Sequence, residues 1–441
     1  MNIGILGGGL TGVTLGYFSN HSVDILEKND EAGGLCRSLQ DDGFTFDYGG
    51  SHVIFSKDKE VLNFMLAVLG KNKVRRRRNT KILFKGNYVK YPFENALNDL
   101  PQQDNFECLY YYVDNLIKRG RAKSKNLKNF RDWIYYTFGM GIADKYMIPY
   151  NEKIWDTKAE LMGLDWVKNR VPQPPVRNVI KSSLGISTEG YTHQLYFYYP
   201  KKGGIQSLIR AIDTMGNQTL LTNFEVKSIK KEDCKWIVSS NSEEKEYDQI
   251  ISTIHLYDLI KALKDVPKDV IEAVNHLKYN SLITVMLGVD LPKLNDFSWL
   301  YIPDKDIKTH RISFPSNYSE VVAPKGKSSV LAEITCHKND DLWSRRDEDI
   351  AKEMVEDLHR LKIIRKSTVC YTKIKRIEYA YVINDLDYTD NLSVITKYLE
   401  KLRISLCGRF SEFKYLNMDA CIRSAMNRAN ELNTFKNEKR N

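Results

Sequence analysis

Six consecutive residues near the N-terminus have the composition of a phosphate-binding turn. Gly7-Gly8-Gly9-Leu10-Thr11-Gly12 has the spacing G-x-G-x-x-G, between an apolar segment and a stretch of helical character. In such a turn Gly7 permits the sharp bend, Gly9 lets the backbone approach a pyrophosphate, and Gly12 allows close packing of helix on strand. Glu27 follows where a carboxylate accepts hydrogen bonds from ribose hydroxyls, which disfavours a 2′-phosphate. The sequence therefore predicts a dinucleotide site.

A second glycine pair follows this carboxylate. Gly33-Gly34-Leu35-Cys36-Arg37 can form another backbone nest for an anion, with the arginine neutralising phosphate charge. A glycine turn with a surface arginine is the alternative. The arrangement resembles the FAD-binding extension of flavoproteins of the amine-oxidase and glutathione-reductase type. Tyr199-Pro200-Lys201-Lys202-Gly203-Gly204 resembles the segment of that superfamily that contacts the flavin. The resemblance implies that the cofactor is FAD.

Arginine and tyrosine residues form a further set, remote from both glycine motifs. Arg311 and Tyr318 flank Pro315, Ser316 and Asn317. Guanidinium groups bind pyrophosphate oxygens bidentately and stabilise charge that develops on a leaving group. For a single pair, packing at a sheet edge is the favoured explanation. The full ordered set favours a second anion site.

Five segments together resemble the UDP-galactopyranose mutase family, particularly its eukaryotic form. The resemblance runs from Gly7 to the helix after Asp419. The segments that carry it are Phe46 to Ser56, with a glycine pair and a histidine; Tyr91-Pro92-Phe93-Glu94-Asn95; Tyr150 to Trp155, with Arg170 fifteen residues beyond; Arg311 with Tyr318; and Tyr381, Arg409 and Tyr415.

The resemblance implies a role for each matching residue. It implies that the catalytic residues are Arg170, Arg311, Arg409 and His52. It implies that the substrate is bound by Tyr91, Phe93, Glu94, Asn151, Trp155, Arg170, Arg311, Tyr318, Tyr381 and Tyr415. It implies that FAD is held by Gly7, Gly9, Leu10, Thr11, Gly12, Glu27, Gly34, Leu35, Arg37, Gly49, Gly50, Ser51, Gly204, Arg409, Asn417 and Met418. No metal site is expected.

The activity that the resemblance implies is a redox-neutral isomerisation. Reduced FAD would attack the anomeric carbon of a nucleotide-diphosphate sugar through N5, and pyranose and furanose forms would interconvert. NAD(P)H or another reductant would be needed to reduce the flavin, and the product would serve cell-surface polysaccharide biosynthesis. Two alternatives stay open: an oxidoreductase that resembles amine oxidase or protoporphyrinogen oxidase, and a catalytically silent nucleotide-sugar binder.

Three positions depart from the family pattern. Ser51 stands between the glycine pair and His52, so the placement of the histidine is open. Glu94 replaces a glutamine. A carboxylate only accepts hydrogen bonds, so it can take N3–H of uracil or both N1–H and N2–H of guanine, and the base stays open. Asn417 and Met418 lie closer to Tyr415 than the equivalent asparagine does in the family.

The elements that must position these residues are read from hydrophobic periodicity. Residues 2–6 and 23–27 predict strands, 105–161 a helical insertion, and 282–381 a strand-rich region with a helix near 347–361. We expect an α/β fold: an FAD-binding Rossmann-like domain of glutathione-reductase type, a helical insertion and an antiparallel β-sheet domain. The expected boundaries are 1–72 with 200–262 and 385–441, then 96–190, then 73–95 with 263–384.

Composition limits the remaining possibilities. The 441 residues carry a net charge of +10, which favours anionic ligands, and Arg75 to Arg78 form the one charge run. We interpret that run as mostly solvated rather than as a nucleic-acid site, because no aromatic platform accompanies it. Seven scattered cysteines, no signal peptide and no apolar stretch of membrane-spanning length predict a cytoplasmic protein. A homo-oligomer is compatible with these features.

Overall fold

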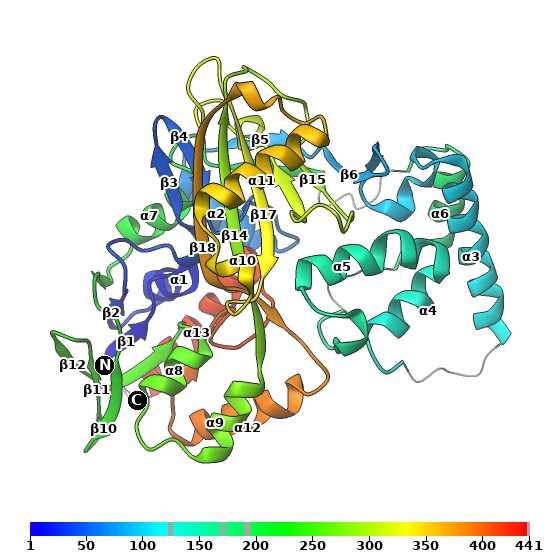
Figure 1. The fold of residues 1–441 in the computed structure, drawn as a ribbon. Coiled ribbons are helices and arrows are strands. Elements are labelled where there is room, and N and C mark those ends of the chain that lie inside the picture. The colour runs from blue at the N-terminus through cyan, green and yellow to red at the C-terminus, as the bar shows by residue number, and fades with distance from the viewer. Residues whose placement is uncertain (122–126, 168–170, 172, 189–194, 439–441) are drawn as a thin grey trace.

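The computed structural model describes residues 1–121, 127–167, 171, 173–188 and 195–438, and Figure 1 shows their arrangement. A parallel sheet lies at the lower left, a larger sheet rises in the centre, and a group of helices stands apart at the right. None of the described helices combines the length and the hydropathy that a bilayer crossing requires.

The parallel sheet carries the N-terminal strand at its centre. Its five strands, in spatial order, are β19 (Ser405–Leu406), β13 (Gln249–Ser252), β1 (Asn2–Leu6), β2 (Ser22–Leu26) and β9 (Thr219–Leu221). Parallel sheets are covered on both faces, which explains why β1 is almost continuously apolar.

Each face of this sheet has its own covering layer. Ile5 packs on the face covered by helices, and Leu6 on the opposite face, as strand alternation requires. The helices of the first face are α1 (Leu10–Phe18), α2 (Lys59–Leu69), α7 (Gln206–Met215) and α13 (Met418–Glu438). The other face meets the antiparallel strands β10 (Ser228–Glu232), β11 (Lys235–Ser239) and β12 (Glu244–Tyr247), with helices α8 (Leu256–Ala262), α9 (Lys268–His276) and α12 (Tyr388–Lys401).

The second sheet is the long twisted one in Figure 1. Its seven strands, in spatial order, are β18 (Val369–Ile383), β14 (Lys278–Val289), β17 (Ser328–Cys336), β16 (Arg311–Ser313), β15 (Trp299–Tyr301), β6 (Thr80–Phe84) and β7 (Asn87–Lys90). Helices α10 (Asp341–Ser344) and α11 (Asp347–Arg360) follow β17, and α11 packs on the sheet. Neighbouring strands of this sheet pair antiparallel, as expected, except for β15 and β6, which pair in parallel.

The helical region contains α3 (Gln102–Arg121), α4 (Phe130–Ile142), α5 (Ile148–Trp155) and α6 (Val176–Ser183). A π-helical turn, Ala143–Met147, joins α4 to α5, and short 3-10 turns lie at 93–95, 97–99 and 159–161. Two further antiparallel sheets have two strands each: β3 (Ser38–Asp41) pairs with β4 (Phe44–Asp47), and β5 (Val74–Arg77) pairs with the distant β8 (Tyr196–Tyr199). The predicted fold class, an α/β flavoprotein with a helical insertion and a multi-stranded sheet, is confirmed.

Candidate active site

A cavity of about 670 Å³ opens where β1 turns into α1. At Gly12 a Cβ atom would lie 2.0 Å from the carbonyl oxygen of Gly7, so only glycine permits this close approach of helix and turn. At Gly9 a Cβ would meet nothing nearer than 3.9 Å, because this residue faces the cavity. The first turn of α1 therefore presents its N–H groups to a ligand that can come close to the backbone.

Glu27 fixes one wall of this cavity at the end of β2. Its side chain is 5% exposed. One carboxylate oxygen accepts from the Gly8 N–H at 2.8 Å, and the other accepts from the Asn29 N–H at 2.9 Å. The carboxylate is thus held in place beside the turn and remains an acceptor for ribose hydroxyls.

The second glycine motif lies directly against the first. Gly33 donates its N–H to the carbonyl of Gly8 at 2.8 Å, and Gly33 and Gly34 both have positive φ. Arg37 lines the same cavity and binds Asp30 at 2.8 Å, while its buried Nε has no hydrogen-bond partner among the described residues. A dinucleotide fits these groups, since it supplies a pyrophosphate for the turn and the arginine and ribose hydroxyls for the carboxylate.

A second cavity, of about 390 Å³, adjoins the first, and four residues line both of them. Those residues are Leu35, His52, Arg409 and Met418. The second cavity runs from this junction between the large sheet and the helical region. Of the substrate-binding residues predicted from the sequence, it is lined by Tyr91, Glu94, Asn151, Trp155, Arg311, Tyr381 and Tyr415.

The structure places several other predicted residues elsewhere. Phe93 and Tyr318 are fully buried and line neither cavity, and Arg170 lies outside the described residues. Leu10, Thr11 and Gly34 line the cofactor cavity as expected, whereas Gly49, Ser51 and Asn417 line the second cavity. Gly50 packs near Arg311 and Glu333, and Gly204 packs on Ser38 and Asp47.

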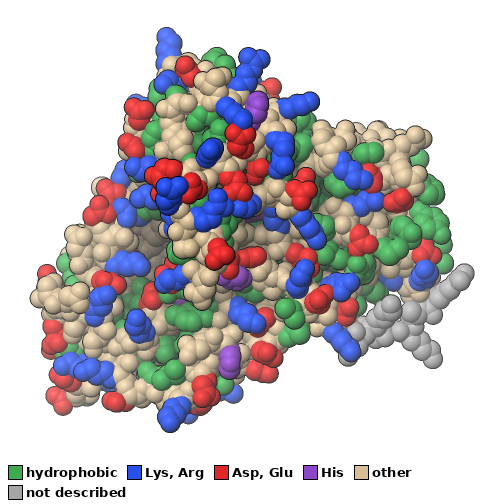
Figure 2. Space-filling view, in the orientation of Figure 1, with side chains coloured by type: hydrophobic (Ala, Val, Ile, Leu, Met, Phe, Trp, Pro, Cys, Tyr) green, Lys and Arg blue, Asp and Glu red, His purple; other side chains and the backbone are tan. Residues whose placement is uncertain are grey.

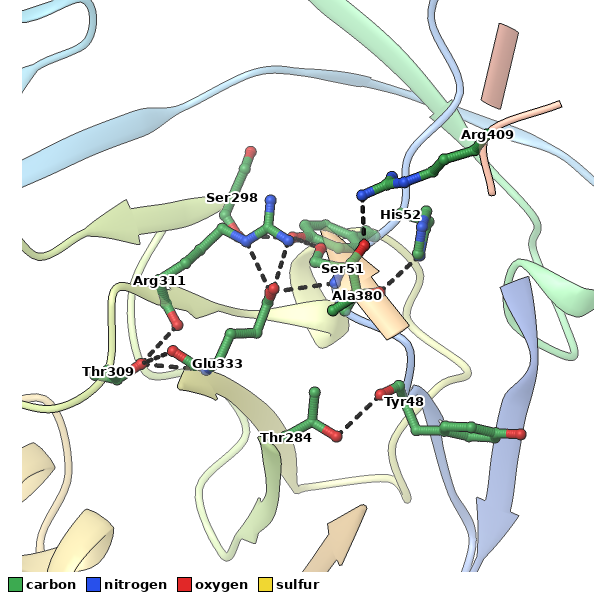
Figure 3. A network of polar contacts seen from close by, with 12 residues as sticks. Tyr48, Ser51, His52, Thr284, Ser298, Thr309, Arg311, Glu333, Ala380 and Arg409 are labelled. Carbon is green, nitrogen blue, oxygen red and sulfur yellow. Dashed lines mark hydrogen bonds and ion pairs between the residues drawn. The ribbon is translucent and has the colours of Figure 1, made fainter. Parts of the chain in front are cut away.

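Arg311 is held by a carboxylate that the sequence pattern did not reveal (Figure 3). Its Nε donates to Glu333 Oε1 at 2.7 Å and its Nη2 donates to Oε2 at 2.5 Å. Glu333 is fully buried and also accepts from the Ser51 N–H at 3.2 Å. Glu333 thus occupies the Nε–Nη2 edge of the guanidinium group and neutralises its charge, so an anion would have to meet the remaining Nη1 side. That Arg311 binds a pyrophosphate stays a prediction.

The signal for Glu333 was present in the sequence. It is the one charged residue of Ser328–Cys336, an otherwise apolar strand, and a buried charge requires a partner. Arg311 and Glu333 are directly opposite each other across the antiparallel pair β16–β17.

His52 stands at the junction of the two cavities and is uncharged at neutral pH. Burial, together with the positive charge of Arg311, lowers its pKa to about 4. Its Nδ1 lies 2.7 Å from the carbonyl oxygen of Gly50, which can only accept, so Nδ1 carries the proton. The neutral ring consequently offers Nε2 as a hydrogen-bond acceptor.

Arg409 brings a second guanidinium group to the same junction. Its Nη2 donates to the carbonyl oxygen of Ala380 at 2.5 Å. The guanidinium carbon lies 4.8 Å from the ring centre of Tyr415 and 5.3 Å from that of Tyr381, and Trp155 meets both rings edge to face. Its buried Nε has no partner among the described residues. The rings of Tyr381 and Tyr415 thus hold the positively charged guanidinium of Arg409 where the two cavities meet.

The far end of the second cavity is aromatic and contains a cation that the sequence interpretation missed. Arg75 and Arg77 are exposed, but Arg78 lines the cavity, with its guanidinium 4.7 Å from the ring of Tyr91 and 4.9 Å from that of Trp299. The interpretation of the run as mostly solvated holds for Arg75 and Arg77, and Arg78 is the exception. Strand alternation is the signal, since it turns every second residue of the run inward.

The fold and the cofactor cavity are those of a flavoprotein, and a second cavity adjoins the cofactor cavity. The chain belongs to the family described as flavin containing amine oxidoreductase, which it matches over residues 13–433, and it binds FAD. The Gly7–Gly12 turn, Glu27 and Arg37 are the groups that would hold this cofactor.

Solved structures with similar folds include a reduced UDP-galactopyranose mutase. It is 25% identical, with a TM-score of 0.88, over 98% of this chain and 94% of that chain. A protein titled as a putative protoporphyrinogen oxidase from Exiguobacterium sp. 255-15 is 16% identical with a TM-score of 0.78, over 98% and 99% of the two chains. A putrescine oxidase variant is 14% identical with a TM-score of 0.68, over 98% of each chain. At these lower identities the likeness shows the fold alone.

Proposed function

We propose that this protein interconverts the pyranose and furanose forms of a nucleotide-diphosphate sugar, as an isomerase that uses reduced FAD without net redox change. The observation that carries the proposal is the second cavity. It joins the cofactor cavity at His52 and Arg409 and ends in a group of aromatic rings. The overall likeness to a reduced UDP-galactopyranose mutase supports the same reading.

The cavity matches the parts of such a substrate in order. Aromatic rings at the far end suit a flat base, and the junction next to the flavin suits the sugar. The pyrophosphate would lie between them, where the side chain of Arg311 is 21% exposed to the cavity despite its pair with Glu333. Because that pair is neutral overall, Arg409 supplies the net positive charge that favours the departing diphosphate.

Reduced FAD, when bound, supplies the nucleophile for the anomeric carbon. The residues of the chain hold the sugar against it. Tyr381 and Tyr415 present hydroxyl donors beside Arg409 without adding charge. His52 accepts a hydrogen bond at the junction while remaining neutral, so it does not add to the local positive charge.

The proposal is tested with dithionite-reduced protein and a panel of nucleotide sugars, the products being resolved by chromatography. We expect exchange between pyranose and furanose forms for at least one sugar, and none with the oxidised protein. Failure of every nucleotide sugar to exchange, with flavin fully bound and reduced, would sink the proposal.

The family and two of its structural neighbours also support an oxidoreductase acting on an amine or a porphyrinogen-like substrate. Steady oxygen consumption with such a substrate, together with no binding of nucleotides, would favour that function. A silent nucleotide-sugar binder would instead bind nucleotide and catalyse neither reaction.

The expected partners follow from the same proposal. NAD(P)H or another reductant would have to reduce the flavin, and a cytoplasmic setting would supply both reductant and nucleotide sugar.

A homo-oligomer would use the apolar side chains that Figure 2 shows over the helical region. Phe106, Tyr110 and Ile117 of α3 are each more than half exposed and spaced to share one helix face.

A further inference from the structure

The base-binding end of the second cavity contains a carboxylate in a fixed position. Glu94 lies in the 3-10 turn 93–95, lines the cavity and is 4% exposed. The turn is tied down by Ser182, whose hydroxyl donates to the Glu94 carbonyl at 2.8 Å, and by Thr188, whose hydroxyl donates to the Asn95 carbonyl at 3.3 Å. These bonds hold the backbone of the turn in place, and the buried side chain of Glu94 forms part of the cavity wall.

Tyrosine rings line the same cavity as this carboxylate. The rings of Tyr146 and Tyr150 are parallel, with centres 5.3 Å apart. Tyr91 and Tyr301 add a second pair of rings, with centres 5.2 Å apart. A planar heterocycle stacks favourably on such rings, which leaves its edge to be read by the polar groups at this end.

An ionised carboxylate can only accept hydrogen bonds from the edge of a base. Both of its oxygens accept, so its best partner is an edge with two adjacent N–H donors. Guanine has such an edge in N1–H and the 2-amino group. Uracil has a single N3–H between two carbonyl oxygens, which the second carboxylate oxygen would repel. Adenine and cytosine present an unprotonated ring nitrogen beside their amino group.

We propose that Glu94 selects guanine, so that the substrate class of this protein is the GDP-sugars. The inference rests on the proposed function and specifies the base for the same site. Arg78 lines the same end of the cavity, and its positive charge offsets that of the carboxylate. Guanine recognition would thus combine stacking on tyrosine rings with two charge-assisted hydrogen bonds to Glu94.

The experiment is a calorimetric titration of the reduced, flavin-loaded protein with GDP, IDP, UDP and ADP. IDP differs from GDP only by the missing 2-amino group, so it removes one of the two donors and nothing else. We expect the Kd for GDP to be at least about tenfold lower than for IDP and for UDP, since each of these bases supplies one N–H donor fewer to the carboxylate.

The variant Glu94→Gln tests the residue itself. An amide offers one acceptor and one donor, which suits N3–H and O4 of uracil, so the preference for GDP over UDP should fall by at least about tenfold. The discrimination between GDP and IDP should also shrink. Glu160→Gln is the matched control, because Glu160 is exposed and binds Arg131 outside both cavities. It should leave all four Kd values unchanged.

The outcomes separate this inference from the proposed function. If UDP binds as tightly as GDP or more tightly, or if Glu94→Gln folds with full flavin and leaves the preference unchanged, guanine selection is wrong and the mutase proposal stands. If none of the four nucleotides binds, both fail. The comparison of GDP, IDP and UDP on the unmodified protein decides the question even if the variant does not fold.

Discussion

The two cavities that meet at His52 and Arg409 are built in different ways. The cofactor cavity is formed by backbone: two glycine motifs, 7–12 and 33–37, lie against each other at the ends of two neighbouring strands. The second cavity, which we propose as the substrate cavity, is formed by side chains from the large sheet, the helical region and the segment around Arg409. One site is thus encoded in two short stretches and the other is assembled by the fold.

This difference decides which substitutions each site tolerates. A backbone site fails when a Cβ atom occupies the space that the chain or the ligand needs. A site formed by side chains is disrupted when a buried polar group loses its partner, because the desolvation of the remaining group is then no longer offset by a hydrogen bond. Three substitutions, ordered by the size of their expected effect, test whether the contrast is real.

The largest effect is expected from Gly12→Ala in the cofactor turn. The added Cβ would lie 2.0 Å from the Gly7 carbonyl oxygen, so the helix cannot keep its distance from the turn. We expect purified protein without bound flavin, as measured by absorbance in the flavin region. Gly120→Ala is the control, since a Cβ there meets nothing within 4 Å and the protein should stay yellow. Full flavin in Gly12→Ala would contradict the backbone account.

An intermediate effect is expected when the charged pair of the substrate cavity is broken. Arg311→Ala leaves the fully buried Glu333 carboxylate without its guanidinium partner. Such a loss typically destabilises a protein by roughly 3–5 kcal/mol. We expect a decrease of this size in the free energy of unfolding of the flavin-loaded protein, measured by urea denaturation.

The double variant Arg311→Ala/Glu333→Gln provides the control for that measurement. The amide oxygen of the glutamine can still accept from Ser51, but no buried charge remains. We expect the double variant to be more stable than Arg311→Ala alone and still to exchange no sugar. Equal instability of the two variants would show that the lost packing, and not the unpaired charge, is responsible.

The same contrast explains what the sequence could predict. The fold class and the cofactor site follow from local signals, because glycine spacing and a strand-ending carboxylate lie within forty residues of one another. The large sheet could be predicted as a strand-rich region, but not its parallel β15–β6 pair, which joins segments more than two hundred residues apart. Strand pairing of this kind is set by the fold and not by local pattern.

The substrate cavity shows more clearly how far prediction from the sequence can reach. Residue identity and spacing brought Arg311, Tyr381, Arg409 and Tyr415 to attention, and the structure places all four around one cavity. The register that sets Glu333 opposite Arg311 could not be read from spacing. A set of matching residue types therefore predicted side chains that line one cavity and left the charge balance within that cavity undetermined.

The smallest effect is expected from Tyr318→Phe, at a residue that the spacing assigned to the substrate. Its hydroxyl lies 2.9 Å from Ser51 Oγ and donates to the Ser298 carbonyl at 3.0 Å, behind the cavity wall. The 3-10 turn Pro315–Asn317 directs it inward, among Phe197, Tyr199 and Trp299. Removing the hydroxyl should cost about 1 kcal/mol of stability, with nucleotide Kd unchanged. A tenfold weaker nucleotide Kd in a variant of near-normal stability would instead place the hydroxyl on the substrate, and this part of the wall would then have to open when nucleotide binds.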